Sequence, residues 1–261
     1  MARSRGYQPT RRTGTRERRP RFVILCEGER TEPLYFEGFA VSSLRVIEVS
    51  GLGMNTDSLV QRLIDQMQQD PDRQADDQYW AVFDRDSFPA ARVRRAFELA
   101  EAHEIKVAFS NEAFEIWYWY HFDYNQAATS RRDYAAKLSE RLGRPYKKND
   151  PALYRELLPM QLKAIAHARK IRALQAELKQ PPEQANPYTT VDLLVMELRR
   201  YDSEILRDRA EKILRRARAR QLPLTIQDES ELRACQRAET LERWEQQIDW
   251  IPDIASLLTS R

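Results

Sequence analysis

Two unbroken apolar runs, each followed by acidic residues, constrain the fold of this chain more than any other feature. The first is Phe22–Cys26, which precedes Glu27, and the second is Tyr79–Phe83, which precedes Asp84 and Asp86. Short apolar runs that are rich in β-branched and aromatic residues and lack polar alternation are typical of strands buried on both faces. The sequence therefore predicts a sheet that helices cover on both sides.

Further strands and helices alternate with these two runs. Leu44–Val49 alternates apolar and polar residues as a half-buried strand does, and Ile105–Phe109 is a fourth strand segment. Helices are predicted between the strands, one with Thr31 as its N-cap and others over about 57–67 and 89–103. Strands that alternate with helices of this length form a mostly parallel sheet with right-handed crossovers. The expected fold class is therefore α/β.

The second half of the chain carries no strong strand signal. Helices are predicted over about 131–142, 151–158, 160–179 and 190–201. Two long charged helices follow, over about 203–221 and 228–248, which either pack on the body or form a hairpin that binds a partner. The expected organisation has four segments: a disordered basic arm over 1–21, an α/β core over 22–125, a helical part over 126–201, and all-helical charged C-terminal segments over 202–261.

Composition excludes several classes of protein. No apolar run approaches the roughly 18–20 residues that span a bilayer, and the N-terminus lacks the apolar stretch of a secretory signal. The two cysteines, Cys26 and Cys235, are too few for a disulfide framework or a thiolate zinc site. We therefore expect a cytoplasmic protein without a membrane partner.

The first 21 residues form an arginine-rich arm. Eight arginines stand against Glu17 alone, so the arm has a charge of +7, and because the whole chain is +3 the remainder is −4. An arm of this kind either keeps the chain in solution or contacts nucleic-acid phosphates without reading sequence. The candidate phosphate contacts in the arm are Arg11, Arg12, Arg18 and Arg19.

Acidic residues follow three of the predicted strands. Glu27 follows the first, Asp84 and Asp86 follow the third, and Glu115 comes just after the fourth. Parallel strands bring their carboxyl ends to one edge, where ligands bind in open α/β sheets, so these four carboxylates are expected to converge. Oxygen ligands suit Mg²⁺ or Mn²⁺, which commonly serve phosphoryl chemistry. Each acid also has a structural alternative, as a turn residue, a helix cap or one half of an ion pair.

The helix environment of Glu115 differs from that of the other glutamates and of the histidines. Glu115 lies in a helix with aromatic residues on nearly every face, so its carboxylate should be buried and either paired, protonated or metal-bound. In contrast, Glu29, Glu32 and Glu112 are predicted at the surface or near a helix start. The histidines share no ligand spacing and are predicted to be structural: His103, His121 and His167.

Several segments of the chain resemble the motifs of the RloB family. Residues 26–32 resemble its C-E-G-x-x-T-E start, residues 82–86 its F-D-x-D, and residues 110–117 its S-N-x-x-F-E-x-W. Residues 146–148 and 186–191 also match. The resemblance runs from about residue 22 to 201, and Asp192 departs from it by standing where a histidine is expected.

This resemblance implies a Toprim-like core and an association with bacterial defence against phage, often beside an AAA- or ABC-type ATPase. We therefore expect a Mg²⁺- or Mn²⁺-dependent nuclease or nuclease-like effector that acts on nucleic-acid phosphodiesters. Asp84 and Asp86 would hold metal, Glu27 would hold metal or act as general acid/base, and Glu115 would complete or orient the site. Further candidate phosphate contacts are Lys147, Lys148 and Arg169.

Two other functions fit the same residues. One is a non-catalytic subunit that binds nucleic acid and holds an ATPase through residues 202–261. The other is a phospho-acceptor switch at Asp84, although Lys106 lies at a strand start rather than at the strand end that such a switch uses. The sequence leaves open whether the substrate is DNA, RNA or tRNA, and whether the chain forms a homo-oligomer.

Deletion of residues 1–20 tests the role of the arm. If the arm contacts phosphates, its removal weakens nucleic-acid binding and flattens the dependence of affinity on salt, because fewer counter-ions are released on binding. Titration of a labelled oligonucleotide at several salt concentrations measures both effects. Binding that is unchanged at every salt concentration would remove the arm from the functional account.

Overall fold

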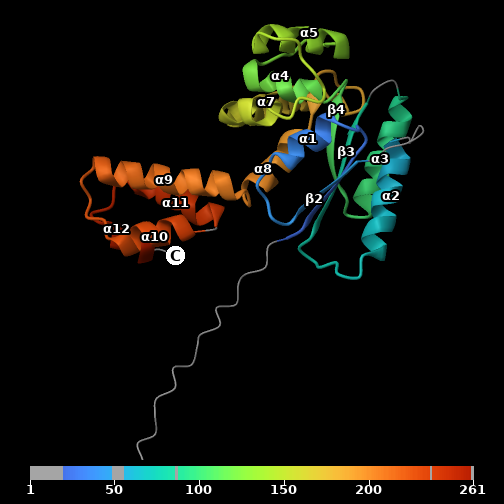
Figure 1. Ribbon diagram of the computed structural model, residues 1–261. Helices are drawn as coiled ribbons and strands as arrows, with labels where there is room; N and C mark the ends of the chain where they lie inside the picture. The colour runs from blue at the N-terminus through green and yellow to red at the C-terminus, as the bar shows by residue number, and fades with distance from the viewer. Residues whose placement is uncertain (1–19, 49–55, 86–87, 236, 260–261) are drawn as a thin grey trace, which may run out of the picture.

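The computed structural model of the chain describes residues 20–48, 56–85, 88–235 and 237–259 (Figure 1). Several of the predictions fall outside these ranges. They concern the basic arm up to residue 19, with Arg11, Arg12, Arg18 and Arg19, and Asp86.

A five-stranded sheet, in the order β2-β1-β3-β4-β5, forms the centre of the molecule. Four strands are parallel, and the short fifth strand runs antiparallel to β4. The prediction of an α/β fold with a mostly parallel sheet is therefore confirmed. The strands are β1 (Phe22–Cys26), β2 (Leu44–Glu48), β3 (Gln78–Asp84), β4 (Lys106–Asn111) and β5 (Tyr188–Thr189).

The fifth strand was not expected, since no strand was predicted after about residue 123. It is only two residues long, too short for a periodic pattern, and it exists because it pairs with the end of β4. Thr189 lies opposite Ser110, and Tyr188 opposite Asn111. Two segments that resemble family motifs, 110–117 and 186–191, therefore meet at this edge of the sheet.

Helices cover both faces of the sheet, as predicted from the unbroken apolar runs (Figure 1). One face carries α2 (Thr56–Gln69) and α3 (Ala90–Ala102). The other face carries α1 (Thr31–Glu37), α4 (Glu115–Phe122), α7 (Gln161–Glu177) and α8 (Val191–Arg199). None of the helices in the described ranges is long and apolar enough to cross a membrane.

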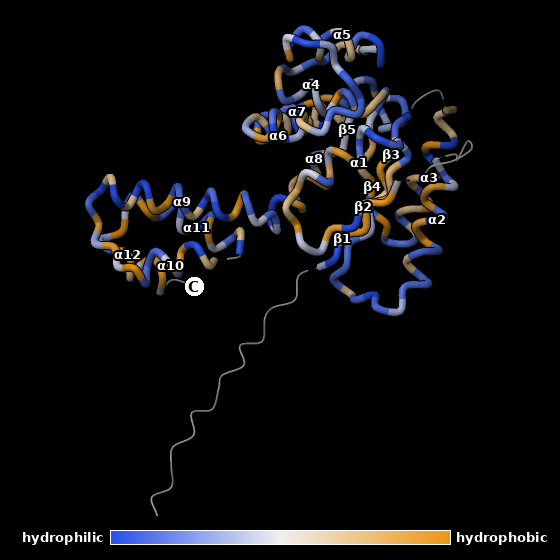
Figure 2. The backbone as a smooth tube through the Cα atoms, viewed as in Figure 1, coloured by the Kyte–Doolittle hydropathy of each residue, from blue (hydrophilic) through white to orange (hydrophobic). Residues whose placement is uncertain are grey.

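Alternate residues of the buried strands contribute to two separate cores. In β1, Phe22, Ile24 and Cys26 pack with α1, α4, α7 and α8, whereas Val23 and Leu25 pack with α2 and α3. Because successive side chains of a strand point to opposite faces, a strand between two helical layers must be apolar at every position. Figure 2 shows the result as hydrophobic strands at the centre of the molecule.

Several helix ends follow from local sequence. Helix α5 (Arg131–Leu142) begins with the Ser130 side chain accepting the Asp133 amide N–H, and it ends at Gly143, whose φ of 66° is the left-handed conformation that favours glycine. The prediction of Thr31 as the N-cap of α1 is wrong, because Thr31 is already the first helical residue. The remaining elements of this region are α6 (Leu153–Leu157) and a 3₁₀ turn (Leu158–Met160).

The C-terminal extension is all-helical, as predicted, and we call it the C-terminal lobe (α9–α12). The first helix of the lobe lies close to the helix predicted over 203–221. The helix predicted over 228–248 is divided in two at Cys235, where the backbone is extended. Apolar side chains of the lobe pack on one another rather than on the body, and Figure 1 shows the lobe to one side of the sheet. The helices are α9 (Ser203–Ala219), α10 (Ile226–Ala234), α11 (Ala238–Gln247) and α12 (Ile254–Thr259).

Asp202 joins the lobe to the body. Its Oδ1 accepts the amide N–H groups of Glu204 at 2.9 Å and Ile205 at 3.0 Å, so it caps α9. Its Oδ2 accepts the amide N–H of Ala40 at 2.9 Å, and Ser203 N–H donates back to the Ala40 carbonyl at 3.2 Å. One buried carboxylate therefore both starts α9 and holds it against the connection between α1 and β2.

Replacement of this carboxylate should destabilise the protein. We expect Asp202→Ala to lower the free energy of unfolding by about 1–3 kcal/mol, because buried amide N–H groups and a helix start lose their acceptor. Urea denaturation followed by circular dichroism measures the change. Asp208→Ala is the control, since Asp208 is exposed on α9, where it lies 4.0 Å from Arg215. Equal stabilities of the two variants would contradict the assignment.

Candidate functional site

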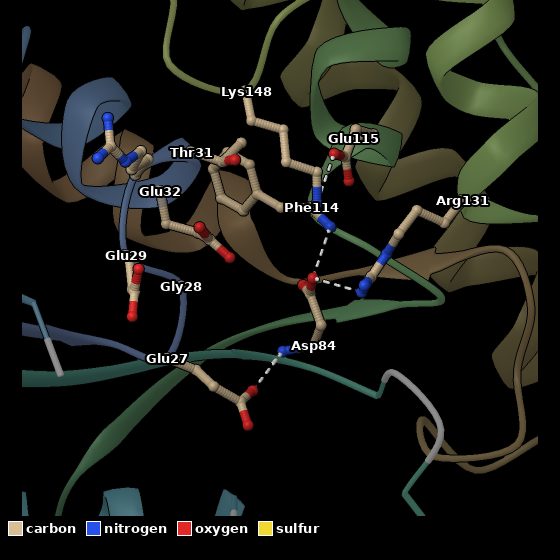
Figure 3. A pocket seen from close by; sticks show the side chains of 11 residues that line it. Glu27, Gly28, Glu29, Thr31, Glu32, Asp84, Phe114, Glu115, Arg131 and Lys148 are labelled. Atoms are coloured by element: carbon tan, nitrogen blue, oxygen red, sulfur yellow. Dashed lines mark hydrogen bonds and ion pairs between the residues drawn. The ribbon is translucent and has the colours of Figure 1, made fainter. Parts of the chain in front are cut away.

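A pocket of about 310 Å³ lies at the carboxyl ends of β1 and β3, next to the first turns of α1, α4 and α5 (Figure 3). This is the edge of the sheet at which the acids were expected to converge. Five acidic and three basic side chains are among its lining residues. The acids are Glu27, Glu29, Glu32, Asp84 and Glu115, and the basic residues are Arg30, Arg131 and Lys148.

Glu27 and Asp84 are neighbours because β1 pairs directly with β3. Cys26 lies opposite Val82, and the amide N–H of Glu27 donates to the Val82 carbonyl at 2.9 Å. The Glu27 carboxylate in turn accepts the amide N–H of Asp84 at 3.3 Å. Figure 3 shows this carboxylate directed to the Asp84 amide and away from the Asp84 carboxylate. The two predicted residues therefore line one pocket, but their carboxylates do not face each other.

Asp84 lies at the centre of the pocket. Its Oδ2 accepts the amide N–H of Phe114 at 3.1 Å and lies 3.5 Å from the Arg131 guanidinium. Burial raises the pKa of Asp84 well above its usual range, and the charges of Glu32 and Glu115 raise it further, whereas Arg131 lowers it. Asp84 is therefore an acid in an environment that disfavours its negative charge unless a cation is close.

Glu32 is a pocket residue that sequence reasoning placed at the surface or near a helix start. It does lie in the first turn of α1, but it is only 6% exposed and faces the pocket. Burial, followed by the charge of Glu115, raises the pKa of Glu32 to about 7. The sequence feature that could have indicated this burial is Gly28, four residues before Glu32. A Cβ at Gly28 would lie 2.1 Å from Oε2 of Glu32, so glycine leaves the space that this carboxylate occupies.

Glu115 is buried and paired, one of the three states expected for it. Its Oε1 accepts the Tyr146 hydroxyl at 3.3 Å and lies 3.6 Å from the Lys148 ammonium group. Burial and the Glu115 charge raise the pKa of Tyr146, so the hydroxyl stays protonated and remains a donor. In the segment that resembles a family motif at residues 146–148, Lys148 therefore lines the pocket and Tyr146 contacts the pocket residue Glu115.

The other two residues of the body that were predicted to contact phosphate do not line the pocket. Lys147 is exposed and is not among the lining residues of the pocket. Arg169 lies on α7, where its guanidinium donates to the Met196 sulfur at 2.9 Å, outside the pocket. Conversely, Arg30 and Arg131 line the pocket although no sequence pattern singled them out. Arg131 reaches it because α5 packs on α4, a tertiary contact that leaves no local signal.

The histidines with described contacts hold structural positions, as predicted for them. His121 is buried, its Nδ1 is 2.9 Å from the Trp117 carbonyl, and burial lowers its pKa to about 3. His167 contacts the Tyr120 carbonyl at 2.9 Å. Neither residue is among those that line the pocket.

The late motif at residues 186–191 supports the end of β4. Asn111 donates through its side chain to the Ala185 carbonyl at 2.7 Å, next to the β4–β5 pairing. Asp192, which departs from the family pattern, is buried and pairs with Arg172, whose Nη2 lies 2.8 Å from its Oδ2. Burial raises the pKa of Asp192 and the arginine opposes this shift. The segment therefore packs against the end of β4.

The donor chemistry of the pocket fits a hard divalent cation. All candidate ligands are carboxylate oxygens, which Mg²⁺ and Mn²⁺ prefer. With every group ionised, the five acids and three bases give the pocket a formal charge of −2, which one divalent cation would balance. Within the described part of the chain, however, no three acidic, histidine or cysteine side chains are already grouped as metal ligands. Side chains would therefore have to turn from their present partners to bind a cation.

Comparison with protein-family models gives a match. A family model described as RloB-like protein covers residues 22–198. This range contains the whole sheet and all described residues that line the pocket, and it ends before the C-terminal lobe. No curated protein and no solved structure matches the chain.

The protonation of Glu32 should appear in the pH dependence of stability. Below about pH 4.5, Glu32 is protonated in the folded and unfolded states. Between about 4.5 and 7 the unfolded chain releases a proton that the folded protein keeps, so the free energy of unfolding falls as pH rises. Glu32→Gln removes this loss, and above about pH 7 in EDTA we expect it to be more stable than wild type by about 1–3 kcal/mol.

Urea denaturation over this pH range measures the difference. Glu29→Gln is the matched control, because Glu29 lies in the same segment but is exposed, and it should follow the wild-type curve. A Glu32→Gln curve parallel to wild type at all pH values would show that Glu32 is not protonated in the folded protein.

Proposed function

Because the chain belongs to the RloB-like protein family, we propose that it is a Toprim-like, metal-dependent nuclease or nuclease-like effector that acts on nucleic-acid phosphodiesters. The observation that supports this proposal is the pocket at the carboxyl edge of the sheet, where buried carboxylates lie beside half-exposed cations. Burying several ionised carboxylates together is unfavourable unless a cation balances their charge. Acids with shifted pKa values are for this reason typical of functional sites.

The carboxylates divide into those that would hold a cation and those that would position it. In this proposal Asp84 and Asp86 bind Mg²⁺ or Mn²⁺, and Glu27 binds it or moves a proton. Glu32 adds a further acid, which faces the pocket, and Glu115 holds the segment with Tyr146 and Lys148 in place. A bound cation would stabilise the attacking and leaving oxygens of the phosphodiester.

The basic residues of the pocket suit the binding of a phosphate group. Arg30, Arg131 and Lys148 surround the acids, and the side chains of Arg131 and Lys148 are 34% and 56% exposed. Cations at the opening of a pocket attract a polyanion and can hydrogen-bond to phosphate oxygens. They contact the backbone of a nucleic acid rather than its bases, so they favour a phosphodiester as substrate without selecting a sequence.

A second candidate is a non-catalytic subunit that binds nucleic acid in a larger assembly. The observation that favours it is the C-terminal lobe, which has its own core, lies outside the matched family range and exposes Trp250 and Ile226 to 87% and 92%. In either case we propose a cytoplasmic role in phage defence beside an AAA- or ABC-type ATPase. A phospho-acceptor switch at Asp84 is not favoured, because Lys106 lies at the opposite end of β4 and donates to Gln78.

Cleavage assays distinguish these functions. We expect wild-type protein with Mg²⁺ or Mn²⁺ to cut at least one of plasmid DNA, single strands and tRNA. Asp84→Ala and Glu27→Gln should each lower the rate about a hundredfold or more, because each removes a proposed ligand. Glu98→Gln, an exposed acid on α3, should cut like wild type.

The outcome with the acid variants decides the assignment. Variants that keep wild-type rates would show that the pocket is not the active site. A wild-type protein that binds nucleic acid but does not cut it with either metal would support the non-catalytic subunit.

A further inference from the structure

We propose that the carboxyl end of α4, with the neighbouring sides of α5 and α7, is a second nucleic-acid contact that binds the phosphate backbone of a duplex beside the acid pocket. We call this surface the basic patch and define it by Lys137, Arg141, Lys163 and Lys170. The inference rests on the proposed function for its ligand, a nucleic acid, but it requires neither a bound cation nor cleavage.

Charge is distributed unevenly along the chain. Residues 22–125 include 19 acidic and 9 basic residues, which give a formal charge of −10. Residues 126–201 reverse this balance, with 15 basic and 8 acidic residues and a formal charge of +7. The helices beside the acidic edge of the sheet therefore supply the attraction for a polyanion that the sheet itself lacks.

Helix α7 carries a cationic stripe on the side that packs on α4. Lys163, His167 and Lys170 follow the spacing i, i+4 and i+7, which places side chains on one side of a helix. The Lys163 ammonium group donates to the Phe122 carbonyl, and Lys170 Nζ lies 4.3 Å from the centre of the Tyr124 ring. The stripe therefore lies along one side of the carboxyl end of α4.

Helix α5 supplies cations on the other side of α4. Lys137 Nζ lies 5.4 Å from the centre of the Trp119 ring, and Arg141 Cζ lies 5.7 Å from it. Figure 1 shows α4 between α5 and α7, with which it is in contact. Basic side chains from two helices therefore gather around the end of a third.

The lysines of the basic patch are available to a ligand. Lys163 and Lys170 are exposed, and Lys137 is half-buried. Among the described residues none of these three lysines forms an ion pair, whereas Arg141 pairs with Asp123 at 3.2 Å. The C-terminal lobe differs, because salt bridges join basic side chains of α9 to acids of α11 and of the residues after it.

The basic patch adjoins the acid pocket because α4 and α5 both begin there. Their first residues, Glu115 and Arg131, line the pocket. Trp119 comes four residues after Glu115, and Lys137 six residues after Arg131, which correspond to about 6 Å and 9 Å along the helix axes. Successive phosphates of a duplex strand rise by about 3.4 Å. A duplex with one phosphodiester in the pocket would therefore place phosphates two or three positions away on the patch.

The aromatic rings of the patch favour a duplex over a single strand. Proteins that bind single strands stack the bases on open aromatic side chains. Here Trp119 is only 9% exposed and lies beneath Lys137 and Arg141, and Lys170 lies over Tyr124. The rings therefore hold cations rather than bases. The ligand that suits them presents phosphates outward and keeps its bases inside.

A purely structural role for the same cations makes a different prediction. Basic side chains at the carboxyl end of a helix stabilise it through the helix dipole. If that were their only role, neutral substitutions would lower the free energy of unfolding and leave the affinity for nucleic acid unchanged. Measurements of stability and of binding on the same variants therefore separate the two roles.

The test uses the whole chain in EDTA, so that no divalent cation contributes to binding. Fluorescence anisotropy with short labelled DNA and RNA duplexes and the matching single strands, at several salt concentrations, measures affinity and its dependence on salt. One variant combines Lys137→Gln, Lys163→Gln and Lys170→Gln, and a second carries Lys→Arg changes at the same three positions. Urea denaturation measures the stability of each variant.

The matched control combines Arg62→Gln, Arg73→Gln and Arg95→Gln, which remove the same amount of charge elsewhere. Arg62 and Arg95 are exposed on α2 and α3, on the opposite face of the sheet. Arg73 is also exposed, and its Cζ lies 5.9 Å from the centre of the Tyr79 ring, so it reproduces the contact of a cation with an aromatic ring.

We expect the triple Lys→Gln variant to bind the duplex that wild type prefers at least about tenfold more weakly. The slope of log affinity against log salt concentration should become shallower by about 2–3, because three phosphate contacts are lost. The loss should be smaller for the single strand. The Lys→Arg variant and the control variant should keep the wild-type slope, and all variants should unfold at similar urea concentrations.

The possible results separate this inference from the proposed function. A triple Lys→Gln variant with wild-type affinity and slope would overturn the basic patch and leave the proposed cation site and cleavage unaffected. An equal loss in the control variant, or an equal loss for the single strand, would also overturn it. If the triple variant does not fold, Lys170→Gln alone decides, with an expected change in slope of about one. Duplex binding that depends on the lysines, in a protein that cuts no nucleic acid, would overturn the nuclease and support the patch.

Discussion

The burial of several carboxylates beside one another is the constraint on which the site depends. Asp84, Glu32 and Glu115 are held where water is scarce, and the pKa values of Asp84 and Glu32 are raised by burial first and by neighbouring negative charge second. Such a group of acids is unfavourable without protons, basic side chains or a metal ion to balance it. Arg131 and Lys148 supply part of that balance, and a divalent cation would supply the rest.

The fold holds these acids together through contacts between adjacent elements. Pairing of β1 with β3 places Glu27 next to Asp84, and the Tyr118 hydroxyl of α4 donates to the Thr31 carbonyl of α1 at 3.0 Å. This hydrogen bond keeps the helix that carries Glu32 against the helix that begins with Glu115. The central sheet and its first helices therefore position the acids, whereas the C-terminal lobe is attached at the opposite end of α1, through Asp202.

Sequence reasoning predicted the elements with strong local signals and missed features that arise from tertiary contact. Unbroken apolar runs identified the buried strands, and the helix predicted over about 131–142 matches α5. Strand β5 and the pocket position of Arg131 depend on neighbours distant in sequence. Glu32 lay within a recognised motif, but its burial depends on the space that Gly28 leaves.

The central claim is that the acid pocket binds a divalent cation, and anomalous X-ray diffraction from crystals grown with Mn²⁺ tests it most directly. The account predicts an anomalous peak within about 2.2 Å of an Asp84 carboxylate oxygen, a typical distance for a hard cation and its oxygen ligand. A pocket without a peak, in crystals where Mn²⁺ is bound elsewhere, would contradict it.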